Sequence, residues 1–418
     1  MMTINTSRVM SSIFILNIFR PYPSFFPGSL GVFFGGRFID ILIVTVLAIL
    51  LILKFSKVLF TDICLLLGIP VFIISLLYGA SLFSGISMGY EFSTFSLVEF
   101  FRYSLTGVIG LAFLTFGKSI GNNFISKFWI YAVLLNLTFN LCLLFIPGFQ
   151  SFADLLISSK TKFTLLGSES SAYVLRSSGL FINPNWAGLF FNLSLTYFIF
   201  SPKEILKISR FFRSILILSA LICIFMTGSR TTLVCTATLF LIYFLLKFKL
   251  WSVPIILFIF IAAQFISINP ENWLFLPVHY KALINAVFIY GDLSSITSFD
   301  ERLELWAFIY ENFVLLRPSI GFGVTDSVGI ADNQFLWMLV SYGYLGTSII
   351  LLYFIILLSS MFLKENMNSN DIFYVKYVNV TFILFLVAGL AGQFFNVTQL
   401  IFLWFMIFGI YLSRIRAS

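Results

Sequence analysis

Residues 335–361, FLWMLVSYGYLGTSIILLYFIILLSSM, contain no charged side chain. A helix needs roughly 20 apolar residues to cross the hydrocarbon core of a bilayer, and this stretch is longer than that. Its apolar residues run continuously, whereas the strands of a transmembrane β-barrel alternate apolar and polar residues. The stretch therefore predicts a membrane-spanning helix and indicates the fold class of the chain around it.

Apolar segments of this kind recur along the whole sequence. The 418 residues are 60% hydrophobic and 10% charged, and soluble domains are rarely so apolar. We therefore predict an all-α polytopic membrane protein with about 11 to 12 spans. Besides 335–361, the expected spans lie near residues 38–54, 58–82, 95–117, 124–147, 185–200, 211–227, 231–247, 250–268, 374–395 and 398–413. Residues 10–34 are apolar but contain Arg20 and three prolines, so a span, a re-entrant segment and an interfacial helix all stay open there.

The basic residues predict the orientation of these helices. One set of loops carries most of the Lys and Arg residues, from Lys54 to Arg416, and cytoplasmic loops are the ones enriched in such residues. The opposite, extracytoplasmic side then holds two long loops, 148–184 and 269–334, and residues 1–418 form one transmembrane domain. The net charge of +8 is scattered over short loops, so we expect no binding of nucleic acid.

Three arginine-bearing stretches fall on the predicted outer side. In the first, Arg176 precedes Asn183-Pro184-Asn185, and Asn183 is expected to cap a helix that begins at Pro184. The N-terminus of a helix carries partial positive charge and free N–H groups, so it binds anions readily. The alternative interpretation is an ordinary cap beside a solvated arginine.

The second stretch is Gly228-Ser229-Arg230-Thr231-Thr232, which predicts a tight turn with Ser229 as the cap of the next span. Arg230 then lies in the first turn of a helix, where the helix dipole disfavours a cation. A phosphate bound bidentately by the guanidinium would remove this cost. Snorkelling of Arg230 to the membrane interface is the alternative.

The third stretch lies in the 269–334 loop. Ser298-Phe-Asp-Glu301 matches a capping box and predicts an amphipathic helix against the membrane surface or the helix bundle. Arg302 is expected at the edge of its apolar stripe, which consists of Leu303, Trp306, Tyr310 and Val314. Arg317 follows this helix, and Asp332-Asn333 is expected to cap the 335–361 span. An ionised Asp at a helix N-terminus suits a general base, although a plain cap explains it equally well.

In chain order the motifs are Arg176…Gly179-Leu-Phe-Ile-Asn183-Pro184-Asn185, Gly228-Ser229-Arg230, Arg302…Trp306…Pro318…Gly321-Phe-Gly323, Asp332-Asn333-Gln-Phe-Leu336 and Gly343-Tyr-Leu-Gly346. This order resembles the O-antigen polymerase and O-antigen ligase superfamily over roughly residues 38–413. The resemblance implies a GT-C-like bundle in the bacterial inner membrane. It also implies glycosyl transfer at the periplasmic face, without a nucleotide sugar. The ligases carry a His-Asn pair where this chain has Asp332-Asn333, so the resemblance favours the repeat-unit polymerases, often called Wzy.

Such a polymerase joins undecaprenyl-diphosphate-linked oligosaccharides into a surface polysaccharide, either O-antigen or capsule. In this interpretation Arg230 and Arg302 stabilise the leaving diphosphate, and Asp332 orients or deprotonates the acceptor hydroxyl. The expected substrate-binding residues are Arg176, Asn183, Asn185, Arg317 and Asn333. We expect no metal and no other cofactor, because arginines can supply the charge that Mg²⁺ supplies elsewhere.

The expected partners are the lipid-linked oligosaccharides and membrane lipid, with a chain-length regulator protein as a further candidate. A lateral groove between spans is expected to hold the prenyl tails. Two other functions stay open: an O-antigen ligase that transfers the finished chain to lipid A-core, and a flippase for the lipid-linked unit. A flippase is expected to show paired broken helices and charges at mid-membrane, whereas here the charge clusters fall at helix ends on one side.

Overall fold

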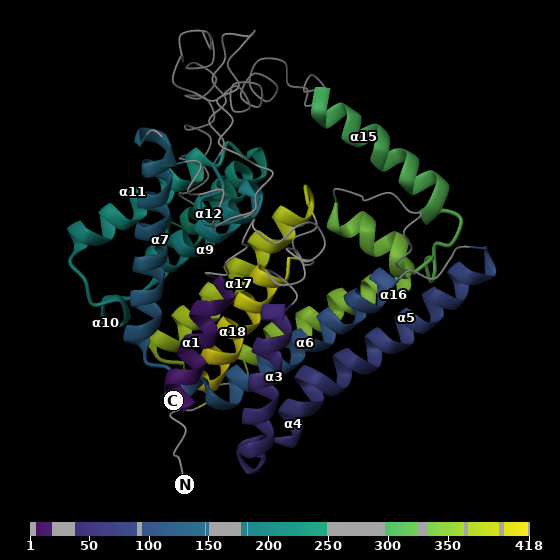
Figure 1. Cartoon of the computed structure of the whole chain (residues 1–418), viewed down its shortest axis with the longest axis horizontal. Helices are drawn as coiled ribbons and strands as arrows, with labels where there is room; N and C mark the ends of the chain where they lie inside the picture. The colour runs from purple at the N-terminus through teal and green to yellow at the C-terminus, as the bar shows by residue number, and fades with distance from the viewer. Residues whose placement is uncertain are drawn as a thin grey trace.

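The computed structural model of the chain contains helices and no strand within the residues that it describes. These are residues 6–18, 38–89, 94–146, 148–149, 177–181, 183–248, 297–323, 333–362, 367–392 and 397–416. Five segments are long and apolar enough to cross a membrane, namely Phe60–Ser87, Asn122–Phe145, Arg230–Lys247, Gln334–Phe362 and Ser369–Gly389. The prediction of an all-α chain with membrane-spanning helices is confirmed to this extent (Figure 1).

The long helices follow the expected spans to within a few residues. They are α3 (Phe38–Leu53), α5 (Ile69–Ser87), α6 (Thr94–Phe116), α7 (Asn122–Phe145), α9 (Pro184–Phe200), α11 (Arg210–Met226), α12 (Arg230–Phe248), α16 (Gln334–Ser359), α17 (Ser369–Gly389) and α18 (Thr398–Ile415). A short helix, α4 (Phe60–Ile63), and a π-helical turn over Cys64–Gly68 lead into α5, and α10 (Lys203–Leu206) precedes α11. The expected span near 250–268 lies outside the described residues.

The N-terminal segment, whose form the sequence left open, begins with α1 (Thr6–Ile18). The Ser7 hydroxyl donates a hydrogen bond to the carbonyl oxygen of Ser119, just after the end of α6 (2.9 Å). Near the other end of α1, Nδ2 of the buried Asn17 donates to the carbonyl oxygen of Gln399, at the beginning of α18 (2.9 Å). Because Ser119 lies near the end of α18 and Gln399 near its beginning, α1 runs antiparallel to α18.

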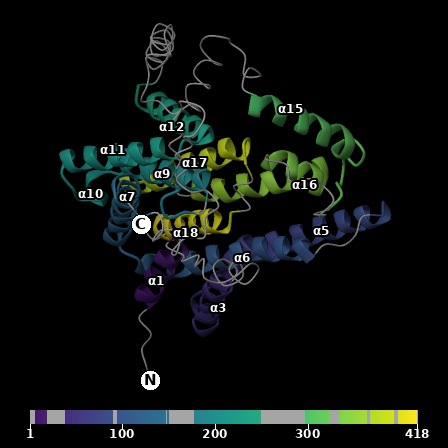
Figure 2. The ribbon, with the colours of Figure 1, turned by 45° about the horizontal axis from the view of Figure 1, so that its top comes forward.

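Helix α18 is the centre of the bundle, and Figure 2 shows it between α17 and α6. Its side chains are buried along almost its whole length. Helix α6 approaches it most closely where two glycines face each other, since a Cβ at Gly409 would lie 2.8 Å from the carbonyl oxygen of Gly110. Small residues allow such close helix contacts in membranes, where no hydrophobic effect drives helices together.

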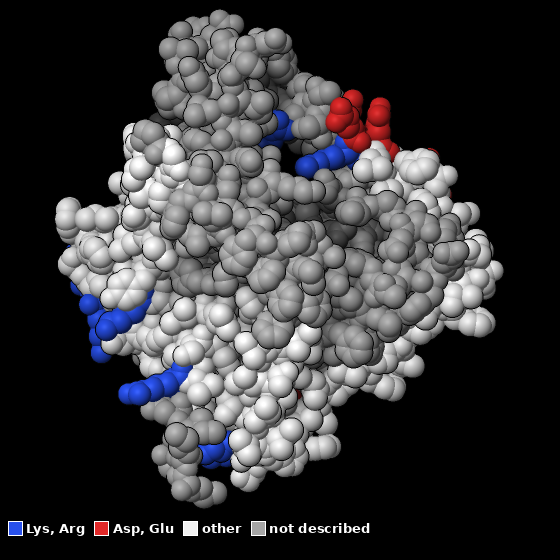
Figure 3. All heavy atoms as spheres, viewed as in Figure 1, with Lys and Arg blue, Asp and Glu red and all other residues white. Residues whose placement is uncertain are grey.

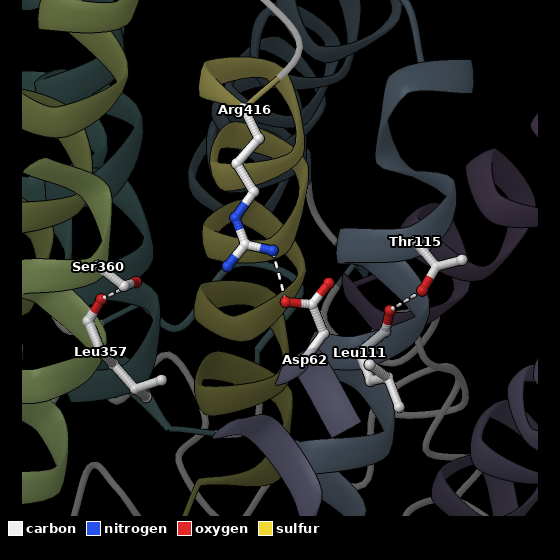
Figure 4. Close-up of polar contacts among 6 residues, drawn as sticks. All are labelled: Asp62, Leu111, Thr115, Leu357, Ser360 and Arg416. Atoms are coloured by element: carbon white, nitrogen blue, oxygen red, sulfur yellow. Dashed lines mark hydrogen bonds and ion pairs between the residues drawn. The ribbon is translucent and has the colours of Figure 1, made fainter. Parts of the chain in front are cut away.

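Arginines tie together the helix ends that are predicted to be cytoplasmic. Nη1 of Arg416 lies 2.5 Å from Oδ1 of the buried Asp62, which links α18 to α4 (Figure 4). Arg414 donates to Oδ1 of Asn122 and to the carbonyl oxygen of Ile120, which links α18 to the beginning of α7. These contacts bring the end of α18 together with α4 and the beginning of α7 at one end of the bundle.

The polar side chains nearby are satisfied within their own helices. The hydroxyls of Thr115 and Ser360 donate to the carbonyl oxygens of Leu111 (2.8 Å) and Leu357 (2.6 Å), as Figure 4 also shows. On the face drawn in Figure 3, Lys and Arg gather over the region of α10, and the largest group of acidic side chains lies at the beginning of α15 (Thr297–Ile309). The predicted orientation rests on the Lys and Arg residues of the loops, and the assignment of the basic end to the cytoplasm stays a prediction.

Candidate functional site

The N-termini of α9 and α12 lie side by side at the end of the bundle opposite the arginine contacts. Nδ2 of Asn192 in α9 donates to the carbonyl oxygens of Gly188 (3.0 Å) and of Thr232 in α12 (3.2 Å). The two helices approach so closely that a Cβ at Gly188 would lie 1.8 Å from Oγ1 of Thr232. Gly188, three residues after Asn185, therefore serves helix packing. It allows the first turn of α9 to lie next to the first turn of α12.

Helix α16 begins at the same level, which its contacts with α17 show. Sγ of Cys235 in α12 donates to the carbonyl oxygen of Leu384 in α17 (3.8 Å). Arg230 lies five residues before Cys235 in α12, and Gly389 lies five residues after Leu384 in α17. Both residues are therefore about 7.5 Å from this contact along their helices, in the same direction along the bundle. A Cβ at Gly389 would lie 3.3 Å from Cβ of Gln334, the first residue of α16. The beginnings of α12 and α16 therefore both reach the last turn of α17.

The cap predicted for α9 is confirmed. Oδ1 of Asn183 accepts a hydrogen bond from the backbone N–H of Asn185 (2.8 Å), and Pro184 is the first helical residue. Asn183 therefore uses its side-chain oxygen to shape the helix end. Arg176, the charge expected beside this cap, lies outside the described residues.

Two asparagines of α7, which the sequence interpretation missed, hold the segment before α9. Oδ1 of Asn136 accepts from the backbone N–H of Leu180 (3.0 Å), and Oδ1 of Asn140 accepts from the Ser177 hydroxyl (2.6 Å). Both asparagines are buried. Gly179 has φ +56°, and a Cβ there would lie 2.6 Å from Oδ1 of Asn136. The sequence offered a signal for these contacts, namely two asparagines four residues apart in an apolar span. Polar residues within spans are costly unless they have partners.

The tight turn predicted between α11 and α12 is also confirmed. Gly228 adopts a left-handed conformation, with φ +58°. Oγ of Ser229 accepts from the backbone N–H of Thr232 (3.2 Å), which makes Ser229 the cap of α12. Arg230 is the first residue of the helix and is half-buried, so its charge stands where the helix dipole disfavours a cation.

A helix, α15, lies where the sequence predicts an amphipathic one, but two details of that prediction are wrong. It already includes Thr297, so Ser298 lies inside its first turn and is not its cap. Of the expected stripe, Trp306 and Val314 pack with Ile309 against α16, whereas Leu303 and Tyr310 are exposed. The π-helical turn over Tyr310–Val314 explains the position of Tyr310, because it places Ile309 and Val314, five residues apart, on one face.

The cap expected from Asp332-Asn333 is formed by Asn333. Its Oδ1 accepts from the backbone N–H groups of Phe335 (2.9 Å) and Leu336 (3.1 Å). Asp332 precedes this cap and lies outside the described residues.

Helix α16 is broken at Gly343, and residues 318–323 fill the break. Gly343 has φ +65° and ψ −174°. Backbone N–H groups donate from Phe322 to the Val340 oxygen (2.8 Å) and from Tyr344 to the Pro318 oxygen (2.6 Å). The segment 318–323, which carries Gly321 and Gly323, is therefore hydrogen bonded to α16 on both sides of Gly343. These glycines thus have a structural role.

Arg317 is held beside this break and not at the beginning of α16. Its neighbour Pro318 pairs with Tyr344, eleven residues after Asn333, which corresponds to roughly 16 Å along a straight helix. Arg302 lies one turn before Trp306 on the side of α15 that faces α16 and is half-buried. Of the expected site residues, Asn183, Asn185, Arg230 and Asn333 therefore lie at the beginnings of α9, α12 and α16, at the same end of the bundle.

An apolar cavity lies next to the break in α16, among α5, α6, α16 and α18. Its volume is about 50 Å³, and its lining includes Leu77, Thr106, Tyr342, Ile350 and Phe405. Nearly all of the lining surface is apolar, so the cavity suits a hydrocarbon chain and not a sugar.

Within the described part of the chain, no group of three or more His, Cys, Asp or Glu side chains could hold a metal ion.

Comparison of the sequence with models of known protein families finds no match, and comparison with curated proteins finds none either. The resemblance of the motifs to a polysaccharide polymerase therefore stays a prediction.

The capping role of Asn333 can be separated from any chemical role. Asn333→Ala is expected to lower stability by about 1 kcal/mol, because two N–H groups at the beginning of α16 lose their acceptor. Asn333→Asp is expected to keep most of the wild-type stability, since Asp caps about as well as Asn. Thermal unfolding of the purified protein in detergent measures both, and an unchanged midpoint for the Ala variant would contradict the cap.

Proposed function

We propose that the chain is a glycosyltransferase that polymerises undecaprenyl-diphosphate-linked repeat units into O-antigen or capsule at the extracytoplasmic face of the bacterial inner membrane. The observation that carries the proposal is the gathering of three capped helix N-termini at one end of the bundle, with Arg230 in the first turn of one of them. Helix N-termini and arginines together form a favourable site for a diphosphate.

The chemistry of the proposed reaction explains why such a site is useful. When the bond between the sugar and the lipid diphosphate breaks, negative charge grows on the leaving group, and preorganised N–H groups and guanidinium groups stabilise that charge. In this mechanism Arg230 and Arg302 neutralise the diphosphate, with Arg176 in a supporting position. Asp332 orients or deprotonates the acceptor hydroxyl. Asn183 and Asn333 contribute through the helix ends that they cap.

The apolar cavity beside Gly343 supports the lipid-linked part of the proposal. The prenyl tail of the substrate must remain in a hydrocarbon environment while its diphosphate reaches the helix ends. A cavity lined by Leu77, Tyr342 and Phe405 offers such an environment between the helices. We propose that it receives part of the tail.

The break in α16 favours a second candidate function, a flippase for the same lipid-linked unit. Transporters bind substrates at discontinuous helices, and Gly343 makes α16 discontinuous. The arginines of the candidate site, however, stand at helix ends and not in the middle of the spans. We therefore place the flippase second. An O-antigen ligase remains the other alternative within the resembling superfamily.

A deletion strain of a Gram-negative host separates these functions by its lipopolysaccharide pattern on a gel. Loss of a polymerase is expected to leave core plus one repeat unit, and the plasmid-borne wild-type chain is expected to restore the ladder. Bare core accompanied by accumulated polymer on its lipid carrier would identify a ligase. Bare core without any polymer would identify a flippase, and either result would overturn the proposed polymerase.

A further inference from the structure

The end of α15 and the segment after it expose a row of large apolar side chains. Phe308 is 56% exposed and Leu316 is 57% exposed, and Leu305, Leu315 and Ile320 are also exposed. We call these five side chains the α15 edge. Water-soluble surfaces rarely carry so many large apolar groups together, and such patches mark contact with a protein or a membrane.

The α15 edge continues into the outward face of a helix that is long enough to cross a membrane. The hydroxyls of Tyr310 and Tyr344 are hydrogen bonded (2.8 Å), and the backbone N–H of Leu345 donates to the Ser319 oxygen (3.2 Å). Leu345 is exposed and begins a row on α16 that runs through Leu352 and Ile356. The spacing of this row places it on one face of α16, and an exposed apolar face of a spanning helix contacts lipid.

Charged residues precede the α15 edge along the chain. Asp300, Glu301 and Glu304 are exposed in the first turns of α15. Glu311 is the exception, because it shares one face of the helix with Glu304 and Phe308. Charged side chains are costly among lipid chains, so the acidic residues at the beginning of α15 favour the aqueous phase for that end of the helix.

We propose that the α15 edge is inserted among the lipid chains of the leaflet in which α16 begins, with the first turns of α15 in the aqueous phase. Lipid is favoured over a protein partner because the edge is continuous with the lipid-facing row of α16. The insertion would hold the loop segment 297–323 at a fixed depth. It would also bring Arg302, at the charged end of the helix, to the level of the lipid headgroups.

Spin labels can measure this depth in the full chain. The four cysteines, Cys64, Cys142, Cys223 and Cys235, are free and are replaced by alanine before one new cysteine is introduced. Leu316→Cys is the test position, Glu304→Cys is the aqueous control within α15, and Leu352→Cys is the lipid-facing control. The labelled protein is reconstituted into phosphatidylethanolamine–phosphatidylglycerol vesicles, and the accessibility to oxygen and to a water-soluble nickel chelate is recorded.

The expected result is a nickel-to-oxygen accessibility ratio at 316 that is well below the ratio at 304 and close to the ratio at 352. A ratio at 316 equal to that at 304 would overturn the proposal, because the edge would then face water. Protection of position 316 from both reagents would also overturn it, in favour of a protein partner or a second copy of the chain.

A second measurement needs no substitution. The wild-type protein is reconstituted with a lipid that carries a photoactivatable diazirine in its acyl chain, and labelled peptides are mapped by mass spectrometry. Labels are expected on residues 305–320 as well as on 345–356. Labels on 345–356 alone would contradict the insertion, whether or not the cysteine variants fold. Both experiments are independent of the proposed enzymatic activity.

Discussion

Gly343→Ala is expected to abolish most of the folded protein. Gly343 has φ +65° and ψ −174°, a backbone conformation that is nearly confined to glycine, and another residue there costs about 1–3 kcal/mol. A Cβ would also lie 2.4 Å from the carbonyl carbon of Ser319 and 2.5 Å from the nitrogen of Ile320. Overpacking of this kind costs a further 1–3 kcal/mol, and backbone atoms cannot move aside as a flexible side chain can.

The measurement is the yield of monodisperse protein after membrane extraction, followed by thermal unfolding. Gly79→Ala is the matched control, because Gly79 lies in α5 and an added Cβ would meet no atom within 4 Å. That control is expected to be neutral or slightly stabilising, since alanine favours a helix over glycine by about 1 kcal/mol. Equal yield and equal unfolding midpoint for the two variants would show that α16 is not broken at Gly343.

Arg230→Lys is expected to lose most polymerising activity although the positive charge is kept. If the guanidinium binds a diphosphate with two parallel hydrogen bonds, an ammonium group cannot replace that geometry. A hydrogen bond to a charged group contributes about 1.5–3 kcal/mol, so the rate is expected to fall roughly 10- to 150-fold. The polysaccharide ladder in a deletion strain, at matched membrane abundance, reports the loss as shorter chains.

The control for this substitution is Arg210→Lys. Arg210 is exposed at the beginning of α11, at the opposite end of the bundle from Arg230, so near-normal chain length is expected. If the Arg230 variant also builds chains of normal length, Arg230 is only an interfacial anchor. The proposed diphosphate site would then lose its central residue.

The sequence predicted the features of this fold that depend on local chemistry. The thickness of a bilayer sets the length of an apolar helix, so the expected span near 398–413 corresponds closely to α18, whereas α17 begins and ends five to six residues earlier than the expected span near 374–395. Caps are also local, because a side chain binds an N–H group two or three residues away, and Asn183 and Ser229 were therefore predicted correctly.

Features that depend on distant contacts were not predicted from the sequence. The break at Gly343 is fixed by hydrogen bonds from residues 318–323, so the apolar run 335–361 predicted one uninterrupted helix. The π-helical turn after Ile309 changed which residues of α15 face α16. Likewise, the common level of Arg230 and Gln334 follows from the contacts that both helices make with α17. Such contacts join residues that lie far apart in the chain.

The central position of α18 has a consequence for how the protein is made. Helices α1 and α6 pack directly against α18, yet both leave the ribosome long before it does. During translation they must wait in the membrane, or beside the translocon, with their future contact surfaces covered only by lipid or by other proteins. The bundle can therefore close only when α18 has been inserted, and a ribosome that stalls before residue 398 would release a set of helices without the one that they surround.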